Sequence, residues 1–133
     1  MTTSDHPVMP APDVTFVIAA FNAEDTIFDA IASAVAQTNV SLEVIVVDDC
    51  STDGTREVVA NYPDSRVRLI VQAVNGGPAA ARNVGFAAAK GRWIAVLDAD
   101  DTIRPKRLRT MIARAEASDA QVVVDNIDVV PLD

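Results

Sequence analysis

Three aspartates, Asp98, Asp100 and Asp101, directly follow the apolar run Trp93–Leu97. An apolar run of this length, bounded by polar residues, is typical of a strand that is buried on both faces of a sheet. Ligands of open α/β sheets bind outside the carboxyl ends of the strands, so we expect these carboxylates at a ligand-binding edge. In extended geometry the side chains of Asp98 and Asp100 point the same way, because successive side chains alternate.

Carboxylates at this spacing favour a cation site. Two carboxylates held close together repel, and the pKa of one rises unless a positive charge lies between them. Mg²⁺ and Mn²⁺ take oxygen ligands and usually share them with substrate phosphates. The pattern therefore predicts a site for a metal and a diphosphate. The alternative is a loop in which the aspartates turn the chain and cap the next helix.

The rest of the chain predicts an α/β fold. Apolar segments of strand length alternate with segments that have helical periodicity or a high alanine content. The expected strands are Val14–Ala20, Leu42–Val47, Val67–Val71, Trp93–Leu97 and Ala120–Val124. The expected helices begin after Asn22, at Thr55, at Pro78 and at Pro105. This alternation predicts a mostly parallel sheet with helices on both faces and right-handed crossovers.

Length and composition fit one acidic domain. The chain has 133 residues, half of them hydrophobic, which suits a single domain with its own core. The formal net charge of −8 argues against nonspecific nucleic-acid binding, which needs clustered Lys and Arg. Cys50 is the only cysteine, so no internal disulfide forms, and a reducing compartment such as the cytoplasm is expected. Three prolines within residues 1–12 predict a flexible tail, followed by a domain over residues 13–133.

Two further strand ends carry side chains with possible functions. Phe21, Asn22 and Glu24 follow the first predicted strand, and Asp48 and Asp49 follow the second. An exposed Phe21 is free to stack on a planar ligand, whereas a buried Phe21 belongs to the core. Asn22 is also a good N-cap for the helix that follows. One of the two aspartates is expected only to shape the loop before the next helix.

Three other features have more than one interpretation. Arg82 lies among alanines on a predicted helix, so its side chain is either solvated or reaches over them to the strand ends. The sequence Gly76-Gly77-Pro78 precedes a helix and would admit an anion, but it lacks the Lys-Ser/Thr of a Walker loop. Cys50 has no nearby His or second Cys, which favours a structural role.

Three segments in this order resemble the family-2 glycosyltransferases of the GT-A fold: FVIAAFNAED (16–25), VIVVDDCSTDGT (44–55) and NGGPAAARNVGFAAAKGRWIAVLDADD (75–101). The resemblance covers about Val14 to Leu108. It implies a three-layer α/β/α, Rossmann-like nucleotide-binding half with strand order 3-2-1-4 plus a fifth strand. It also implies transfer of a sugar from a nucleotide-sugar, with UDP the expected nucleotide, to a saccharide or lipid-linked acceptor in bacterial cell-surface or exopolysaccharide synthesis.

The resemblance also implies roles at the nucleotide for individual residues. Phe21 stands where an aromatic ring packs against the base. Asp49 matches the carboxylate that reads the edge of the base, and Arg82 matches a further contact to the nucleotide. Ala20 and Glu24 flank the end of the first strand and are implied to contact the nucleotide as well.

The metal and the catalytic base follow from the same resemblance. Asp98 resembles the residue that meets the ribose or the metal, and Asp100 the ligand of Mn²⁺ or Mg²⁺. A cation there would stabilise the charge of the leaving nucleoside diphosphate, while a carboxylate base helps an acceptor hydroxyl to attack the anomeric carbon. That base is expected beyond Asp133, so the 133-residue chain is expected to be the donor-binding half and to transfer no sugar alone.

Two alternatives and two further expectations remain. A receiver-type phosphoacceptor domain fits the size and the acidic strand ends, and an interaction module without a ligand fits the composition. The apolar segment Val122–Val130 predicts self-association of the chain if it is exposed. For the full-length protein, the cytoplasmic face of the membrane is a second expected location beside the cytoplasm.

Overall fold

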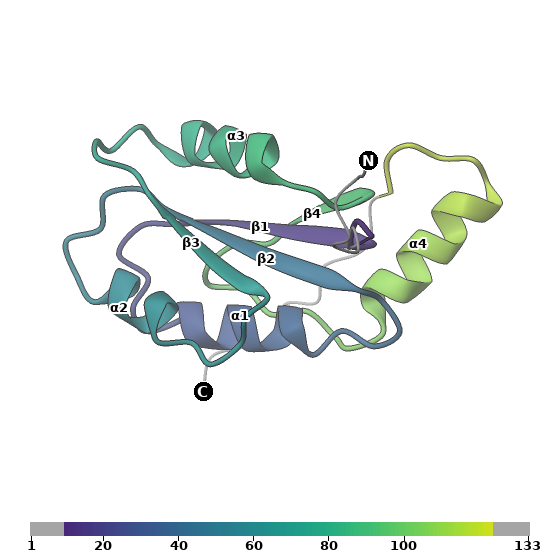
Figure 1. Cartoon of the computed structure of the whole chain (residues 1–133), viewed down its shortest axis with the longest axis horizontal. Helices are drawn as coiled ribbons and strands as arrows, with labels where there is room; N and C mark the ends of the chain where they lie inside the picture. The colour runs from purple at the N-terminus through teal and green to yellow at the C-terminus, as the bar shows by residue number, and fades with distance from the viewer. Residues whose placement is uncertain (1–9, 124–133) are drawn as a thin grey trace, which may run out of the picture.

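The computed structural model describes residues 10–123, and its centre is one parallel four-stranded sheet (Figure 1). The strands are β1 (Val14–Ala20), β2 (Leu42–Asp48), β3 (Val67–Val71) and β4 (Trp93–Val96). Their order in the sheet is β3-β2-β1-β4, as predicted from the resemblance. Ala20 pairs with Asp48 at the end of the β1–β2 ladder, so the two strands end at the same level of the sheet.

Four helices form the outer layers. They are α1 (Ile27–Val35), α2 (Thr55–Ala60), α3 (Pro78–Ala88) and α4 (Arg107–Ala117). In Figure 1, α3 lies above the sheet and α1 and α2 lie below it, with α4 at one end. The predicted three-layer α/β/α architecture is therefore confirmed. None of the helices within residues 10–123 has the length and hydropathy needed to cross a bilayer.

Two apolar clusters hold the layers together. The larger one joins β1, β2, α1 and α4 through residues such as Phe16, Ile31 and Leu108. The smaller one joins the opposite face of β2 to α3 through Ile45, Val47 and Ala81. Strand β1 is buried along almost its entire length, because it pairs on both sides and has helices over both faces.

Strand β4 differs from the prediction. It ends at Val96, and Ile94 and Val96 are 45% and 54% exposed, so the strand is not buried on both faces. The reason is its place in the sheet: β4 is an edge strand, and α3 packs on β1 and β2. Trp93 and Ala95, on the other face, pack against the larger core cluster.

The predicted fifth strand, Ala120–Val124, is absent over the residues that the structure describes, and Val124 lies outside them. Asp119 adopts a left-handed φ of 54°, and the amide of Ala120 donates to the carbonyl of Ala115 at 2.8 Å. This backbone conformation and this hydrogen bond turn the chain at the end of α4, where the prediction had an extended strand. Most of the segment expected to self-associate, and residues 1–9 of the predicted tail, also lie outside the described residues.

Gly85 allows α3 to lie close to the sheet. A Cβ atom at this position would lie 2.4 Å from Cγ1 of the buried Val17. We expect Gly85→Ala to destabilise the fold by about 1–2 kcal/mol, because overpacking outweighs the gain in helix propensity. Urea denaturation measures the change. Adding Val17→Ala should recover part of the loss that Gly85→Ala causes, and strictly additive effects of the two substitutions would contradict this account.

Candidate functional site

The loops that follow the adjacent strands β1 and β4 border a cleft of about 440 Å³ at the carboxyl edge of the sheet. The residues that line the cleft come from the end of β1 and the loop after it, and from the loop after β4. The lining residues are Ala19, Phe21, Asn22, Ala23, Asp25, Thr26, Asp98, Ala99 and Asp100. Of the predicted site residues, the cleft therefore brings together Phe21, Asp98 and Asp100.

Phe21 is an exposed aromatic residue at the wall of this cleft. It is 50% exposed, so the interpretation that places it in the core is wrong. A phenyl ring at this position offers an apolar face to a planar ligand that enters the cleft. The structure thus favours the stacking interpretation.

Three carboxylates, from Asp98, Asp100 and Asp101, form an acidic cluster whose ligand atoms all lie within 4.8 Å of one another. A turn brings them together, because β4 ends at Val96 and the amide of Asp101 donates to the carbonyl of Asp98 at 3.1 Å. The expected extended geometry at Asp98 and Asp100 is wrong. Partial burial and the neighbouring charges of Asp100 and Asp98 raise the pKa of Asp101.

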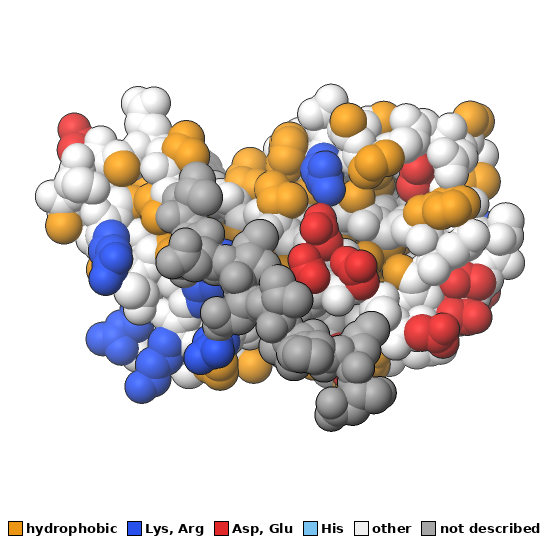
Figure 2. All heavy atoms as spheres, turned by 180° about the vertical axis from the view of Figure 1, so that it is seen from behind, with side chains coloured by type: hydrophobic (Ala, Val, Ile, Leu, Met, Phe, Trp, Pro, Cys, Tyr) orange, Lys and Arg blue, Asp and Glu red, His pale blue; other side chains and the backbone are white. Residues whose placement is uncertain are grey.

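Arg82 reaches from α3 to this acidic cluster. Its Nη2 lies 3.2 Å from Oδ1 of Asp98, and both side chains are partly exposed. The interpretation that Arg82 extends over the alanines of α3 to the strand ends is therefore confirmed. An acidic group with a basic side chain beside it is visible on the face shown in Figure 2.

The acidic cluster fits a hard divalent cation. All three groups are carboxylates, and oxygen is the donor that Mg²⁺ and Mn²⁺ prefer. The three carboxylates are exposed, so a cation there keeps coordination positions for water or for phosphate oxygens. The single positive charge of Arg82, which pairs with Asp98, is smaller than the charge of three ionised carboxylates.

The two aspartates after β2 hold loops in place. Asp48 is fully buried, accepts the amide of Ser51 at 3.0 Å and pairs with Nε of Arg56 at 3.2 Å. Asp49 is 4% exposed, and its two carboxylate oxygens accept the amides of Gly76 and Gly77 at 2.8 and 2.9 Å. Asp48 thus has the loop-shaping role expected for one of the pair, and Asp49 ties the loop after β3 to the end of β2.

Ala20 and Glu24 lie beside the cleft and do not line it. Ala20 is buried, and its carbonyl accepts the amide of Asp49 at 2.8 Å. The carboxylate of Glu24 accepts the amide of Gly54 at 2.8 Å. In this structure both residues connect the ends of β1 and β2.

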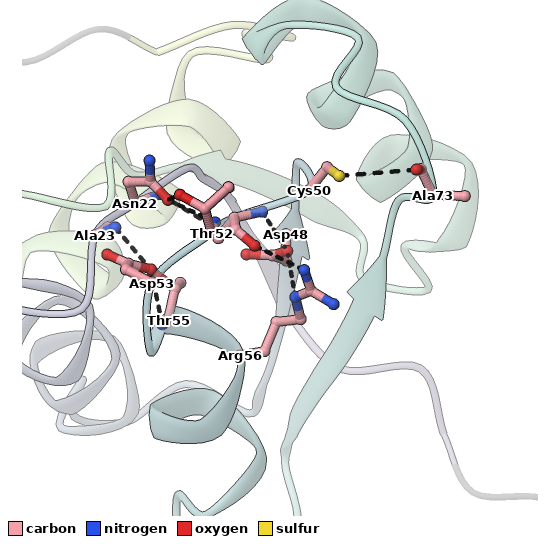
Figure 3. Close-up of polar contacts among 10 residues, drawn as sticks. Asn22, Ala23, Asp48, Cys50, Thr52, Asp53, Thr55, Arg56 and Ala73 are labelled. Carbon is pink, nitrogen blue, oxygen red and sulfur yellow. Dashed lines mark hydrogen bonds and ion pairs between the residues drawn. The ribbon is translucent and has the colours of Figure 1, made fainter.

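Sequence reasoning missed a hydrogen-bond network between the loops after β1 and β2 (Figure 3). Asn22 does not cap α1, which begins at Ile27 after Thr26; instead its Oδ1 accepts the amide of Thr52 at 2.8 Å. The hydroxyl of Thr55 accepts the amide of Ala23 at 2.8 Å. The φ of Asn22 is 48°, a left-handed conformation in which Asn is enriched. The signal for this role was thus an asparagine directly after a buried strand.

Comparison with known proteins identifies the family. Residues 15–133 match the family model described as glycosyl transferase family 2. The chain belongs to this family. This finding confirms the resemblance and excludes the receiver-domain alternative.

Relatives and solved structures agree with this assignment. The chain is 64% identical over 122 residues to the succinoglycan biosynthesis protein ExoO of Rhizobium meliloti, a match that covers 92% of the chain and 35% of ExoO. It is similar to TarS (residues 1–349) of S. aureus in complex with UDP, with 30% identity, a TM-score of 0.72, and 79% of this chain and 32% of that one covered.

A second structural neighbour carries a metal. It is the mannosyltransferase PcManGT from Pyrobaculum calidifontis in complex with GDP-Man and Mn²⁺, with 30% identity, a TM-score of 0.60, and 70% of this chain and 29% of that one covered. The chain thus spans about a third of the length of ExoO and of the structures that it matches.

Asp53 gives the loop network a pH dependence. Partial burial raises the pKa of Asp53. Hydrogen bonds from Thr55 and from the amide of Glu24 together lower the pKa by more than burial raises it, so the net shift is downward. A lowered folded-state pKa contributes stability above the ordinary pKa and loses it as the pH falls through the lowered value. We therefore expect Asp53→Ala to lower the melting temperature at pH 7, with a deficit that shrinks as the pH falls below about 4.

Thermal denaturation across this pH range measures the deficit. Asp29→Ala, which removes an exposed carboxylate from α1, is the matched control for net charge. A deficit that is the same at every pH, or that equals that of the control, would contradict the role given to Asp53.

Proposed function

We propose that the cleft binds a nucleoside-diphosphate sugar together with a divalent cation. The observation that carries the proposal is that one cleft is lined both by an exposed aromatic ring, Phe21, and by Asp98 and Asp100 of the acidic cluster. These two groups match the two chemically distinct parts of such a donor, which are a planar base and a negatively charged diphosphate. The complexes of TarS with UDP and of PcManGT with GDP-Man and Mn²⁺ support the proposal.

Different residues bind the base of the donor and the cation at its diphosphate. Phe21 stacks on the base. The resemblance gives Asp49 the contact to the edge of the base, for which its nearly buried carboxylate uses the lone pairs that the amides of Gly76 and Gly77 leave free. Asp98 and Asp100 hold the cation, with Asp101 as a third carboxylate within reach. The cation, when bound, supplies positive charge to the diphosphate as the bond to the sugar breaks.

Arg82 adds a positive charge beside the acidic cluster. The Arg82 guanidinium, paired with Asp98, places a fixed positive charge next to the site expected for the diphosphate. Because the overall charge of the chain is negative, such local cations are needed to attract an anionic donor.

We also propose a role for the whole protein. It transfers the sugar to a saccharide or lipid-linked acceptor during synthesis of a cell-surface polysaccharide, with UDP as the expected nucleotide. The name of ExoO, a succinoglycan biosynthesis protein, supports the proposal that the product is a polysaccharide. The expectation that the catalytic base lies beyond Asp133 stays a prediction.

Calorimetric titration with UDP, GDP and dTDP in the presence of Mn²⁺ tests the donor and the cation. We expect UDP to bind most tightly, and Asp100→Ala to weaken it by roughly tenfold or more because an oxygen ligand of the cation is lost. Asp29→Ala, which changes the net charge equally away from the cleft, should leave the affinity within about twofold of wild type. Absence of UDP binding by the wild-type chain with Mn²⁺ would overturn the proposal.

A second measurement isolates the contribution of the base to the affinity. We expect Phe21→Ala to weaken UDP binding by about tenfold, because stacking of an aromatic ring on a base contributes on the order of 1–3 kcal/mol. Binding of Mn²⁺-pyrophosphate, which has no base, should not change. Phe28→Ala is the control, since Phe28 is equally exposed but packs on Tyr62 outside the cleft. Equal losses for UDP and pyrophosphate would contradict the stacking role of Phe21.

A further inference from the structure

The position of the Phe21 ring depends on the backbone that carries it. Phe21 is half exposed at the wall of the cleft, and the aromatic contact in the described part of the chain joins Phe28 and Tyr62 instead. Ring stacking within the protein therefore does not fix Phe21. The next residue, Asn22, begins a turn whose hydrogen bonds hold the backbone beside the ring.

The turn at Asn22 has an unfavourable backbone conformation. The φ of Asn22 is 48°, in the left-handed region that residues other than glycine rarely occupy. Asn tolerates this region better than most residues, but the conformation persists only where the surroundings hold it. Bonds from another segment must therefore stabilise it.

Those bonds come from the loop after β2. The amide of Asn22 donates to the hydroxyl of Ser51 at 2.9 Å, and Oδ1 of Asn22 accepts the Thr52 amide at 2.8 Å and the Thr52 hydroxyl at 3.3 Å. The amide of Glu24 donates to Oδ2 of Asp53 at 3.3 Å. The two loops are thus joined by hydrogen bonds that involve backbone and side-chain groups of both (Figure 3).

The partner loop is itself anchored in the core. Ser51 is 3% exposed, and its amide donates to the fully buried Asp48. Its carbonyl accepts Nη2 of Arg56 at 2.7 Å, and the same guanidinium pairs with Asp48. A continuous set of polar bonds therefore runs from the end of β2 through Ser51 and Thr52 to Asn22, next to Phe21.

We propose that Asn22 is a positioning residue for the base of the donor. Its side-chain bond to Thr52 and its left-handed backbone hold Phe21 at the wall of the cleft, so that the ring is in place before the ligand arrives. The inference rests on the proposed function and adds a residue that acts through Phe21. Preorganisation of this kind raises affinity because the ligand does not have to order the loop.

Asn22→Gly tests the inference, because glycine adopts the same φ without strain but lacks the Oδ1 acceptor. The readout is the affinity for Mn²⁺-UDP divided by the affinity for Mn²⁺-pyrophosphate, both measured by calorimetry. We expect the ratio to fall by about tenfold, which corresponds to about 1.4 kcal/mol, while binding of Mn²⁺-pyrophosphate stays within about twofold of wild type. A purely structural role would weaken both ligands together.

Two variants complete the experiment. Asn22→Asp keeps an acceptor oxygen for the Thr52 amide, so it should bring the ratio back toward that of wild type. Asn39→Gly is the matched control, because Asn39 also has a left-handed φ, of 57°, but lies between α1 and β2, outside the cleft. Its ratio should equal that of wild type.

The outcomes separate the two proposals. If the wild-type chain binds no UDP with Mn²⁺, the proposed function fails, and the inference about Asn22 fails with it. If the wild-type chain binds UDP but Asn22→Gly leaves the ratio unchanged, or Asn22→Asp does not restore it, the inference about Asn22 alone is overturned.

Discussion

Hydrogen bonds between neighbouring loops are the interaction on which the cleft depends. Where parallel strands end together, the backbone groups of the following loops no longer have partners in the sheet, and unpaired buried groups are costly. Side-chain oxygens from the adjacent loop accept hydrogen bonds from the backbone amides. Asp49 accepts amides of the loop after β3, and Asn22 and Glu24 accept amides of the loop after β2. The site is therefore built mainly by polar bonds on top of an apolar sheet.

The network also explains why an acidic chain tolerates a buried carboxylate. Asp48 is fully buried, which is costly unless the charge is paired and hydrogen-bonded. Arg56 supplies the charge and Ser51 a hydrogen bond, while Arg56 remains partly exposed and keeps some of its hydration. In the described part of the chain, Oδ1 of Asp48 has no hydrogen-bond partner, so both compensating contacts are made through Oδ2.

The sequence predicted the strands that stand out as apolar or β-branched runs between turn residues. Val14–Ala20 and Val67–Val71 match β1 and β3 residue for residue, because apolar and β-branched runs between turn residues leave few alternatives. The pattern of Trp93–Leu97 was misleading: an apolar sequence does not reveal whether a strand is central or at an edge, and Ile94 and Val96 are exposed. Asn22 was assigned to a cap, since local sequence cannot distinguish a bond to the next helix from one to a loop 30 residues away.

The placement of β1 has a consequence for the motions of the site. Val14–Val17 pair with strands on both sides, Ile18–Ala20 pair with β2, and helices cover both faces of the strand, so local fluctuations rarely expose its amides to water. Exchange of these amides with deuterium then requires opening of the entire domain. The loop that carries Phe21 therefore starts from slowly exchanging backbone, and only the few residues between β1 and α1 separate it from the next helix.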